Sequence, residues 1–245
     1  MSTHRHVRAV LGALVLPCFL TATVFPAGNA PVVTPDSIAR AFSEGTLSLN
    51  IRTRYEGVEQ TGLMDAGALT VRTRLRYTTA PINGLKAMVE AENIAPINGD
   101  HYSQAGLNPG GAGRAVVADP EGTEINQAFL SYTTGKSTVT AGRQRLVLDN
   151  HRFIGDVGWR QNMQTFDAVT LADKSIDRLS LNYGYLYHVN RVFGDRHAQG
   201  DWESDSHVAN ASYSGLPIGT LTGYAYLLDF ANAAVNSSST YGFSL

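Results

Sequence analysis

Cysteine is almost absent from this chain of 245 residues, because its one cysteine, Cys18, lies near the N-terminus. The rest of the chain therefore cannot build a disulfide framework. Long apolar runs are missing after residue 30, which excludes a membrane-spanning helix of about 20 apolar residues. Lysine is also scarce: only three of the 19 basic residues are lysine, and the formal net charge is −2. This balance gives no reason to expect nucleic acid as a partner.

The first thirty residues have the features of an export signal. Arg5 and Arg8 form a basic region, and residues 9–25 are mostly apolar. Gly28 and Ala30 suit the small-x-small pattern of a cleavage site. We predict a signal peptide over 1–30, followed by a short periplasmic lead over 31–45 that contains one brief helix with Asp36 or Ser37 as its N-cap.

Strict alternation of apolar and polar residues begins at residue 46. In the stretch "ALTVRTRLRYTT" (68–79), three arginines stand two positions apart. In a strand such residues share one face, about 7 Å apart. The neighbouring stretches 46–57 and 85–93 place charges in the same way. We therefore expect one charged patch made of Arg52, Arg54, Arg72, Arg74, Arg76, Lys86, Glu90 and Glu92, with the apolar set on the opposite face.

Ten segments with strand character follow one another to the end of the chain. We predict strands at 46–58, 68–79, 84–93, 123–133, 137–145, 166–172, 178–190, 206–214, 219–230 and 239–245. Short turns alternate with long polar connections, of which the longest are 94–122 and 191–205. Outer-membrane barrels show this rhythm. We expect an all-β fold, an antiparallel transmembrane β-barrel over 46–245.

One segment, 146–165, breaks the alternation and is dense in mixed chemistry. In a barrel, such an insert either covers the mouth or turns inward and narrows the lumen. Its own residues and the two arginines that precede it are our candidates for a constriction: Arg143, Arg145, Asp149, Arg152, Trp159 and Arg160.

Enzymatic alternatives have weaker support. Glu90 and Glu92 could form a catalytic pair, as in glycosidases, but acids two apart on a strand are commonly a solvated face. The acids of "GDWESDS" (200–206) read as a solvated loop, and the histidines lack metal-ligand spacing. We expect no cofactor and no metal. The alternative function is a secreted soluble β-protein that binds or cleaves polysaccharide.

Three strings resemble a known family: "SEGTLSLNIRTRYE", "DPEGTEINQAFLSY" and "AGRQRLVLDNHRFIGDVGWRQNMQTFDAV". They are similar to the alginate-export family of bacterial outer-membrane porins. The resemblance implies a monomer in outer-membrane lipid, inserted by the barrel-assembly machinery, with an arginine-rich lumen that passes anionic small solutes or a polyuronate such as alginate. Barrels of that family have more strands than we predict, so we expect this chain to be the N-terminal part of a larger barrel. A structural barrel with a plugged lumen is a third alternative.

Overall fold

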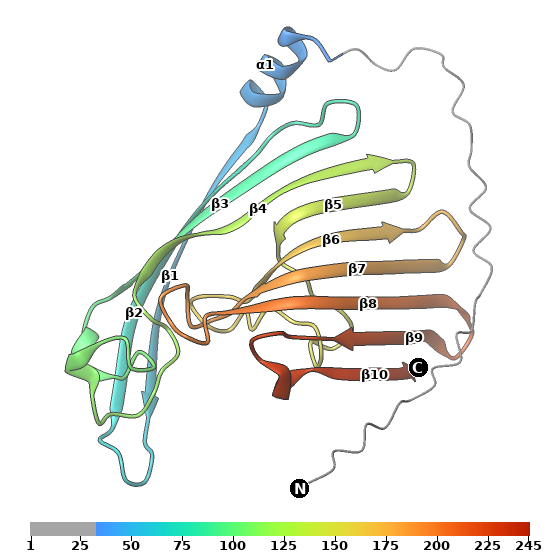
Figure 1. The fold of residues 1–245 in the computed structure, drawn as a ribbon. Helices are drawn as coiled ribbons and strands as arrows, with labels where there is room; N and C mark the ends of the chain where they lie inside the picture. Colours follow the sequence, from blue (N-terminus) through green and yellow to red (C-terminus); the bar gives the residue numbers. More distant parts are fainter. Residues whose placement is uncertain (1–32) are drawn as a thin grey trace, which may run out of the picture. The chain divides into compact units, whose positions relative to one another are not determined.

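Ten antiparallel strands, each hydrogen bonded to the next along the chain, form one sheet (Figure 1). The computed structural model describes residues 33–245, so the expected signal peptide lies outside the described residues. The strands are β1 Thr46–Val58, β2 Ala66–Thr78, β3 Leu85–Pro96, β4 Gly122–Thr134, β5 Ser137–Gln144, β6 Thr165–Asp173, β7 Leu179–Asn190, β8 Asp201–Leu216, β9 Gly219–Leu228 and β10 Ser238–Ser244. The helical elements are α1 Pro35–Ser43 and three short 3-10 turns, η1 Gly99–His101, η2 Pro109–Gly111 and η3 Ala234–Asn236.

All ten predicted strands are present, with two local corrections to the sequence reading. Strand β8 begins at Asp201, so the acidic stretch 201–205 is strand and not loop. Residues 201–203 pair with β7. The sequence reading took them for a loop because the stretch is rich in acidic residues. The helix begins earlier than predicted, because the N-cap is Thr34, two residues before Asp36 and three before Ser37. The Thr34 side chain accepts a hydrogen bond from the Ser37 backbone.

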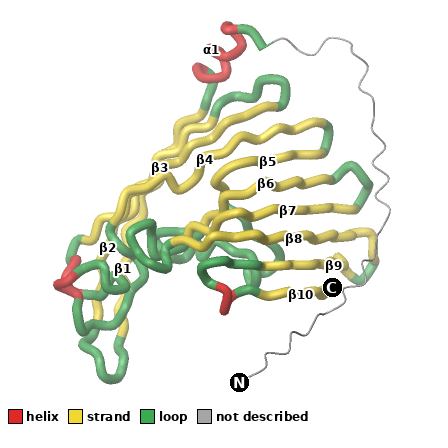
Figure 2. The backbone as a smooth tube through the Cα atoms, in the orientation of Figure 1, coloured by secondary structure: helices red, strands yellow, loops and turns green. Residues whose placement is uncertain are grey.

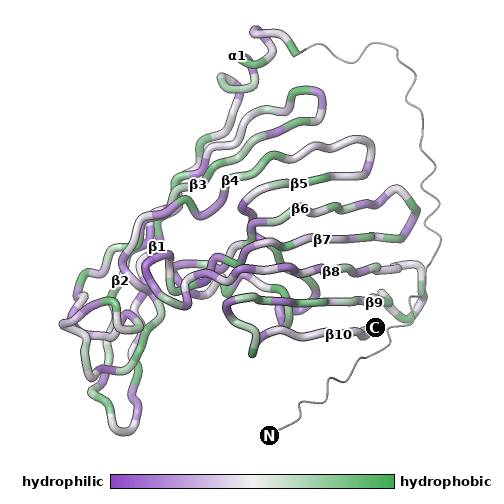
Figure 3. The backbone as a smooth tube through the Cα atoms, viewed as in Figure 1, coloured by the Kyte–Doolittle hydropathy of each residue, from purple (hydrophilic) through white to green (hydrophobic). Residues whose placement is uncertain are grey.

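The two faces of the sheet differ sharply in exposure. Along β1 the side chains of Leu47, Leu49 and Ile51 are 60–66% exposed. On the other face Arg72 and Glu90 are buried. Figure 3 shows hydrophilic and hydrophobic residues interspersed along the strands, as alternation requires. A water-soluble sheet would cover its apolar face, so the exposed apolar side contradicts the soluble alternative.

The connections segregate by length between the two ends of the strands (Figure 2). Turns at 79–84, 135–136, 174–178 and 217–218 join strands at one end. The long connections 97–121, 145–164 and 191–200 lie at the other end, because consecutive strands are antiparallel. In outer-membrane barrels the short turns face the periplasm and the long loops face outward. No helix in residues 33–245 is long and apolar enough to cross a membrane.

The segment 145–164 packs against the charged, inner face of the sheet. Ile154 from this segment is 2% exposed and lies in a cluster with Phe166, Leu186, Val208 and Tyr226 from β6 to β9. This apolar contact fixes one side of the segment, while its polar residues reach toward β1 and β2. The site described below lies between them.

Candidate functional site

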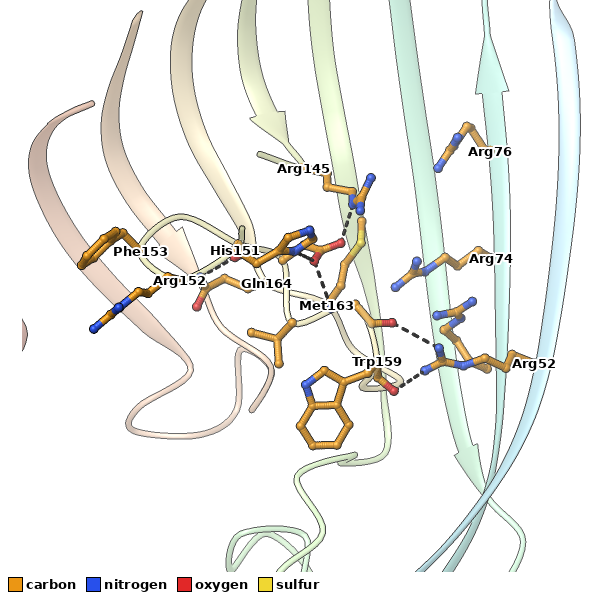
Figure 4. A pocket seen from close by; sticks show the side chains of 15 residues that line it. Arg52, Arg74, Arg76, Arg145, His151, Arg152, Phe153, Trp159, Met163 and Gln164 are labelled. Atoms are coloured by element: carbon orange, nitrogen blue, oxygen red, sulfur yellow. Dashed lines mark hydrogen bonds and ion pairs between the residues drawn. The ribbon is translucent and has the colours of Figure 1, made fainter. Parts of the chain in front are cut away.

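A cavity of about 830 Å³ separates the β1–β2 wall from the segment 145–164. Arginines line both sides of it. In Figure 4, Arg52, Arg74 and Arg76 project from the wall, and Arg145 lies across the cavity from them. The lining also includes Arg72, His151, Arg152, Phe153 and Trp159.

Two glutamates on β3 hold two of the wall arginines in place. Glu92 accepts a hydrogen bond from the Arg74 guanidinium, and Glu90 forms an ion pair of 2.6 Å with Arg76. Both carboxylates are 1% exposed. Such charge-assisted contacts fix the planar guanidinium groups without removing them from the cavity. The sequence placed these four residues together on one face, and they are in contact.

A β-bulge completes the support of Glu90. The register between β3 and β4 shifts at Glu90, so that Asn126 and Gln127 both turn toward it. Their side-chain amides donate hydrogen bonds of 2.7 Å and 3.1 Å to the same carboxylate oxygen. Bulges commonly re-aim side chains in this way.

Two other wall arginines carry charge that no carboxylate neutralises. Within residues 33–245, neither Arg52 nor Arg72 forms an ion pair. Arg72 is 6% exposed, and its Nη2 donates to the Asn50 side chain at 2.6 Å. The Arg72 Nε and the Glu92 Oε1 are buried and have no hydrogen-bond partner among the described residues. Both atoms are shielded from the cavity as well, so each is a desolvated polar group without compensation.

Arg52 fastens the segment 145–164 to the wall. Its Nε donates to the Gln161 Oε1 at 2.8 Å, and its other nitrogens donate to backbone carbonyls, including that of Gly158 at 3.2 Å. Gln161 is fully buried, and its amide donates to the Thr70 hydroxyl at 2.8 Å. We call these contacts of Arg52 and Gln161 the clasp.

A four-residue charge cluster adjoins the clasp. Arg160 binds Glu56 at 2.9 Å, and Arg54 binds both Glu56 and Asp119. Asp119, 1% exposed, also accepts the backbone N–H of Gln161 at 2.8 Å. The cluster therefore joins β1, the long connection 97–121 and the segment 145–164. The Trp159 ring lies 4.1 Å from the Arg160 guanidinium and is 57% exposed.

Arg145 is held from within the segment by Asp156. Burial acts to raise the pKa of the Asp156 carboxyl, but hydrogen bonds from Arg145 and from the Gly158 backbone outweigh it and hold that pKa below its ordinary value. The His151 Nδ1 lies 3.6 Å from the same carboxylate. Arg145 stays about half exposed, so its charge is anchored and still accessible from the cavity.

Half of the fourteen expected site residues line the cavity, and four more contact lining residues: Arg54, Glu90, Glu92 and Arg160. The other three lie away from the lining. Arg143 forms an ion pair with Asp167 at 2.8 Å. It lies four positions after the exposed Val139 on β5, so alternation places it on the same outward face as Val139. Asp149 accepts hydrogen bonds from β8 and β9, including one of 3.1 Å from the Asn210 amide. Lys86 is exposed near the short-turn end of β3.

Gln161 and Asp119 were not among the expected site residues, although both organise the site. Nothing in their local sequence marks them, because each acts on partners more than forty residues away. No group of three or more His, Cys, Asp or Glu side chains in residues 33–245 could hold a metal ion.

Comparison with known proteins gives both a family and a fold. The family model described as alginate export matches residues 45–182. No curated protein sequence matches the chain significantly. Among solved structures, OccAB3 of Acinetobacter baumannii is similar with a TM-score of 0.61 and 16% identity, covering 76% of this chain and 50% of that one. A BenF-like porin from Pseudomonas fluorescens Pf-5 gives 0.60 and 15% identity, covering 77% and 51%. Pseudomonas aeruginosa OccK8 (OprE) gives 0.58 and 14% identity, covering 77% and 47%.

These similarities show an outer-membrane β-barrel fold of the porin type. The chain spans about half the length of the solved structures it matches. At 14–16% identity these similarities establish the fold but do not identify a transported solute. Any inference about the solute must therefore come from the cavity itself. The exposed apolar face is then the face that meets outer-membrane lipid.

Proposed function

We propose that this chain, which belongs to the alginate-export family of outer-membrane porins, passes anionic solutes through the arginine-lined cavity. The observation that carries the proposal is the unequal pairing of its charges. Arg74, Arg76 and Arg145 have carboxylate partners, whereas Arg52 and Arg72 have none among the described residues. The wall therefore keeps an excess of positive charge.

The low-dielectric walls of the cavity strengthen the attraction of this positive charge for passing anions. A cleft lined by one sign of charge concentrates counter-ions, and exposed guanidinium groups bind carboxylates through two parallel hydrogen bonds. Arg76 and Arg145, about half exposed, supply such groups from opposite sides of the cavity. Several weak sites in series favour conduction, because a single tight site would hold the solute. A polyuronate, with a carboxylate on every sugar, fits this description.

Reversal potentials in planar lipid bilayers test the proposal. The purified protein is placed between solutions of unequal KCl concentration, and we expect the reversal potential to show a preference for chloride over potassium. Replacing Arg72 and Arg152 by glutamine should reduce the preference for chloride, because two positive charges are removed from the cavity lining. The fold should persist, because neither substitution leaves a carboxylate without its ion-pair partner. Arg178→Gln, in a short turn away from the cavity, is the matched control and should behave as the parent protein.

Two results would contradict the proposal. A cation preference in the parent protein would show that the arginines do not set selectivity. Membrane insertion without any conductance would indicate a plugged barrel. We also propose that the protein is inserted by the barrel-assembly machinery and acts as a monomer, which crosslinking in isolated outer membranes would test.

A further inference from the structure

The helix α1 carries two large apolar side chains that the sheet leaves uncovered. Ile38 is 44% exposed and Phe42 is 59% exposed, and both belong to the nine-residue helix. We infer that α1 is an interfacial anchor, which lies along the edge of the lipid layer with Ile38 and Phe42 in the boundary between headgroups and acyl chains.

The helix is built to be stable at this position. Thr34 and Ser37 form a reciprocal capping box, and Pro35 occupies the first turn. At about 100° per residue, Ile38, Phe42 and Ala41 fall on one side. The polar residues Asp36 and Arg40, like Glu44 after them, fall on the other. A short helix of this pattern, with charges of both signs on its polar side, suits an interface better than a protein core.

Contacts with the β2–β3 hairpin fix which way the apolar side points. The Phe42 ring stacks on the Tyr77 ring with centroids 6.3 Å apart and planes within 8°. The Tyr77 hydroxyl donates a hydrogen bond to the Phe42 carbonyl, and the Ala80 N–H donates to the Ala41 carbonyl at 2.9 Å. Gly45 permits this approach, because a Cβ there would lie 2.2 Å from the Tyr77 hydroxyl oxygen.

The stacked pair continues the lipid-facing surface of the sheet. Tyr77 lies opposite Leu47, and Leu47 is 66% exposed on the face that meets lipid. Phe42 extends that surface past the end of β1, at the end of the sheet that carries the short turns. Because aromatic rings and short amphipathic helices both favour the headgroup region, the occupant of this surface is the lipid leaflet at that end.

Spin labelling tests the location of α1. Ile38→Cys and Arg40→Cys, each with Cys18 replaced by serine, carry a nitroxide label in protein reconstituted into phosphatidylethanolamine and phosphatidylglycerol vesicles. Oxygen concentrates in lipid, whereas a nickel chelate stays in water. We expect a higher ratio of oxygen to nickel accessibility at position 38 than at position 40. Ile38 is the chosen site because Phe42, and not Ile38, stacks on Tyr77.

Other outcomes would overturn the inference. Equal, nickel-dominated accessibility at both positions would place the helix in water. Low accessibility to both reagents at position 38 would mean that protein covers it, including a second copy of this chain. The result is independent of the proposed anion selectivity, since α1 contributes no residue to the cavity.

Discussion

Arg52 and Arg72 lie directly opposite each other on β1 and β2. Like charges at opposed positions destabilise a strand pair unless other groups compensate them. Here the compensation is neutral: Arg52 binds Gln161 and three backbone carbonyls, and Arg72 binds Asn50. The pair keeps its double charge: all three Arg52 nitrogens are hydrogen bonded, whereas Arg72 has one such contact and its Nε lacks a partner. Two unneutralised charges are what an anion-attracting wall requires.

The clasp should fail when Gln161 is shortened. Gln161→Ala leaves the Arg52 Nε and the Thr70 hydroxyl without their partner, and a buried unsatisfied group costs about 1–3 kcal/mol. We expect the segment 145–164 to detach intermittently, seen as increased current noise and brief conductance steps in single-channel recordings. Gln60→Ala, in the exposed β1–β2 loop, is the control. Recordings from Gln161→Ala as quiet as those from Gln60→Ala would show that the clasp does not hold the segment.

Arg74 and Glu92 should be coupled in stability. Arg74→Gln leaves a carboxylate that is 1% exposed without its ion pair, and breaking a buried pair costs about 3–5 kcal/mol. We expect a lower urea midpoint for unfolding from vesicles. Adding Glu92→Gln should restore most of the loss, because the side chain that lost its ion pair is then neutral. Additive effects of the two substitutions would mean that the pair does not interact in the folded protein.

Deleting residues 151–162 should widen the passage. These residues include Arg152 and Trp159, which line the cavity, and Gln161, which binds the β1–β2 wall. With a short glycine-serine linker in their place, we expect a larger single-channel conductance in 1 M KCl. Unchanged conductance, in a protein that still migrates as a folded barrel on unheated gels, would assign the segment to the outside of the passage.

Acid should release Arg145 only at low pH. Because the folded-state pKa of Asp156 lies below its ordinary value of about 3.9, the contact stabilises the protein fully above that value and is lost as pH falls through the lowered pKa. We expect conductance to be constant from pH 7 to pH 5 and to change only below about pH 4. Asp156→Asn should show the low-pH behaviour at pH 7. A transition between pH 5 and pH 7 that disappears in this variant would contradict the assignment.

The sequence was most informative where side chains alternate. Period two placed Arg72, Arg74 and Arg76 on one face because a strand allows no other arrangement, and Glu90 and Glu92 followed from a meander of neighbouring strands. The three strings quoted for the resemblance lie in or overlap the region that the family model matches.

Sequence reasoning failed where contacts cross between segments without periodicity. The clasp joins Arg52 to Gln161, 109 positions later, and nothing in a loop of mixed polarity specifies which residue will reach a given wall. Arg143 was misplaced for the opposite reason: it precedes the irregular segment but still belongs to β5, so alternation decides its side. The start of β8 was missed because acidic residues are uncommon in strands.

The segment 145–164 leaves β5 and returns to the adjacent strand β6, so its length is independent of every strand register in the sheet. Charge on the wall, in contrast, is set by β1, β2 and β3. An engineer could therefore shorten or exchange the segment to adjust the bore of a nanopore, and separately recode the arginines to choose the ion. Natural variants could in the same way change the length of the segment while the charges on β1, β2 and β3 stay in place.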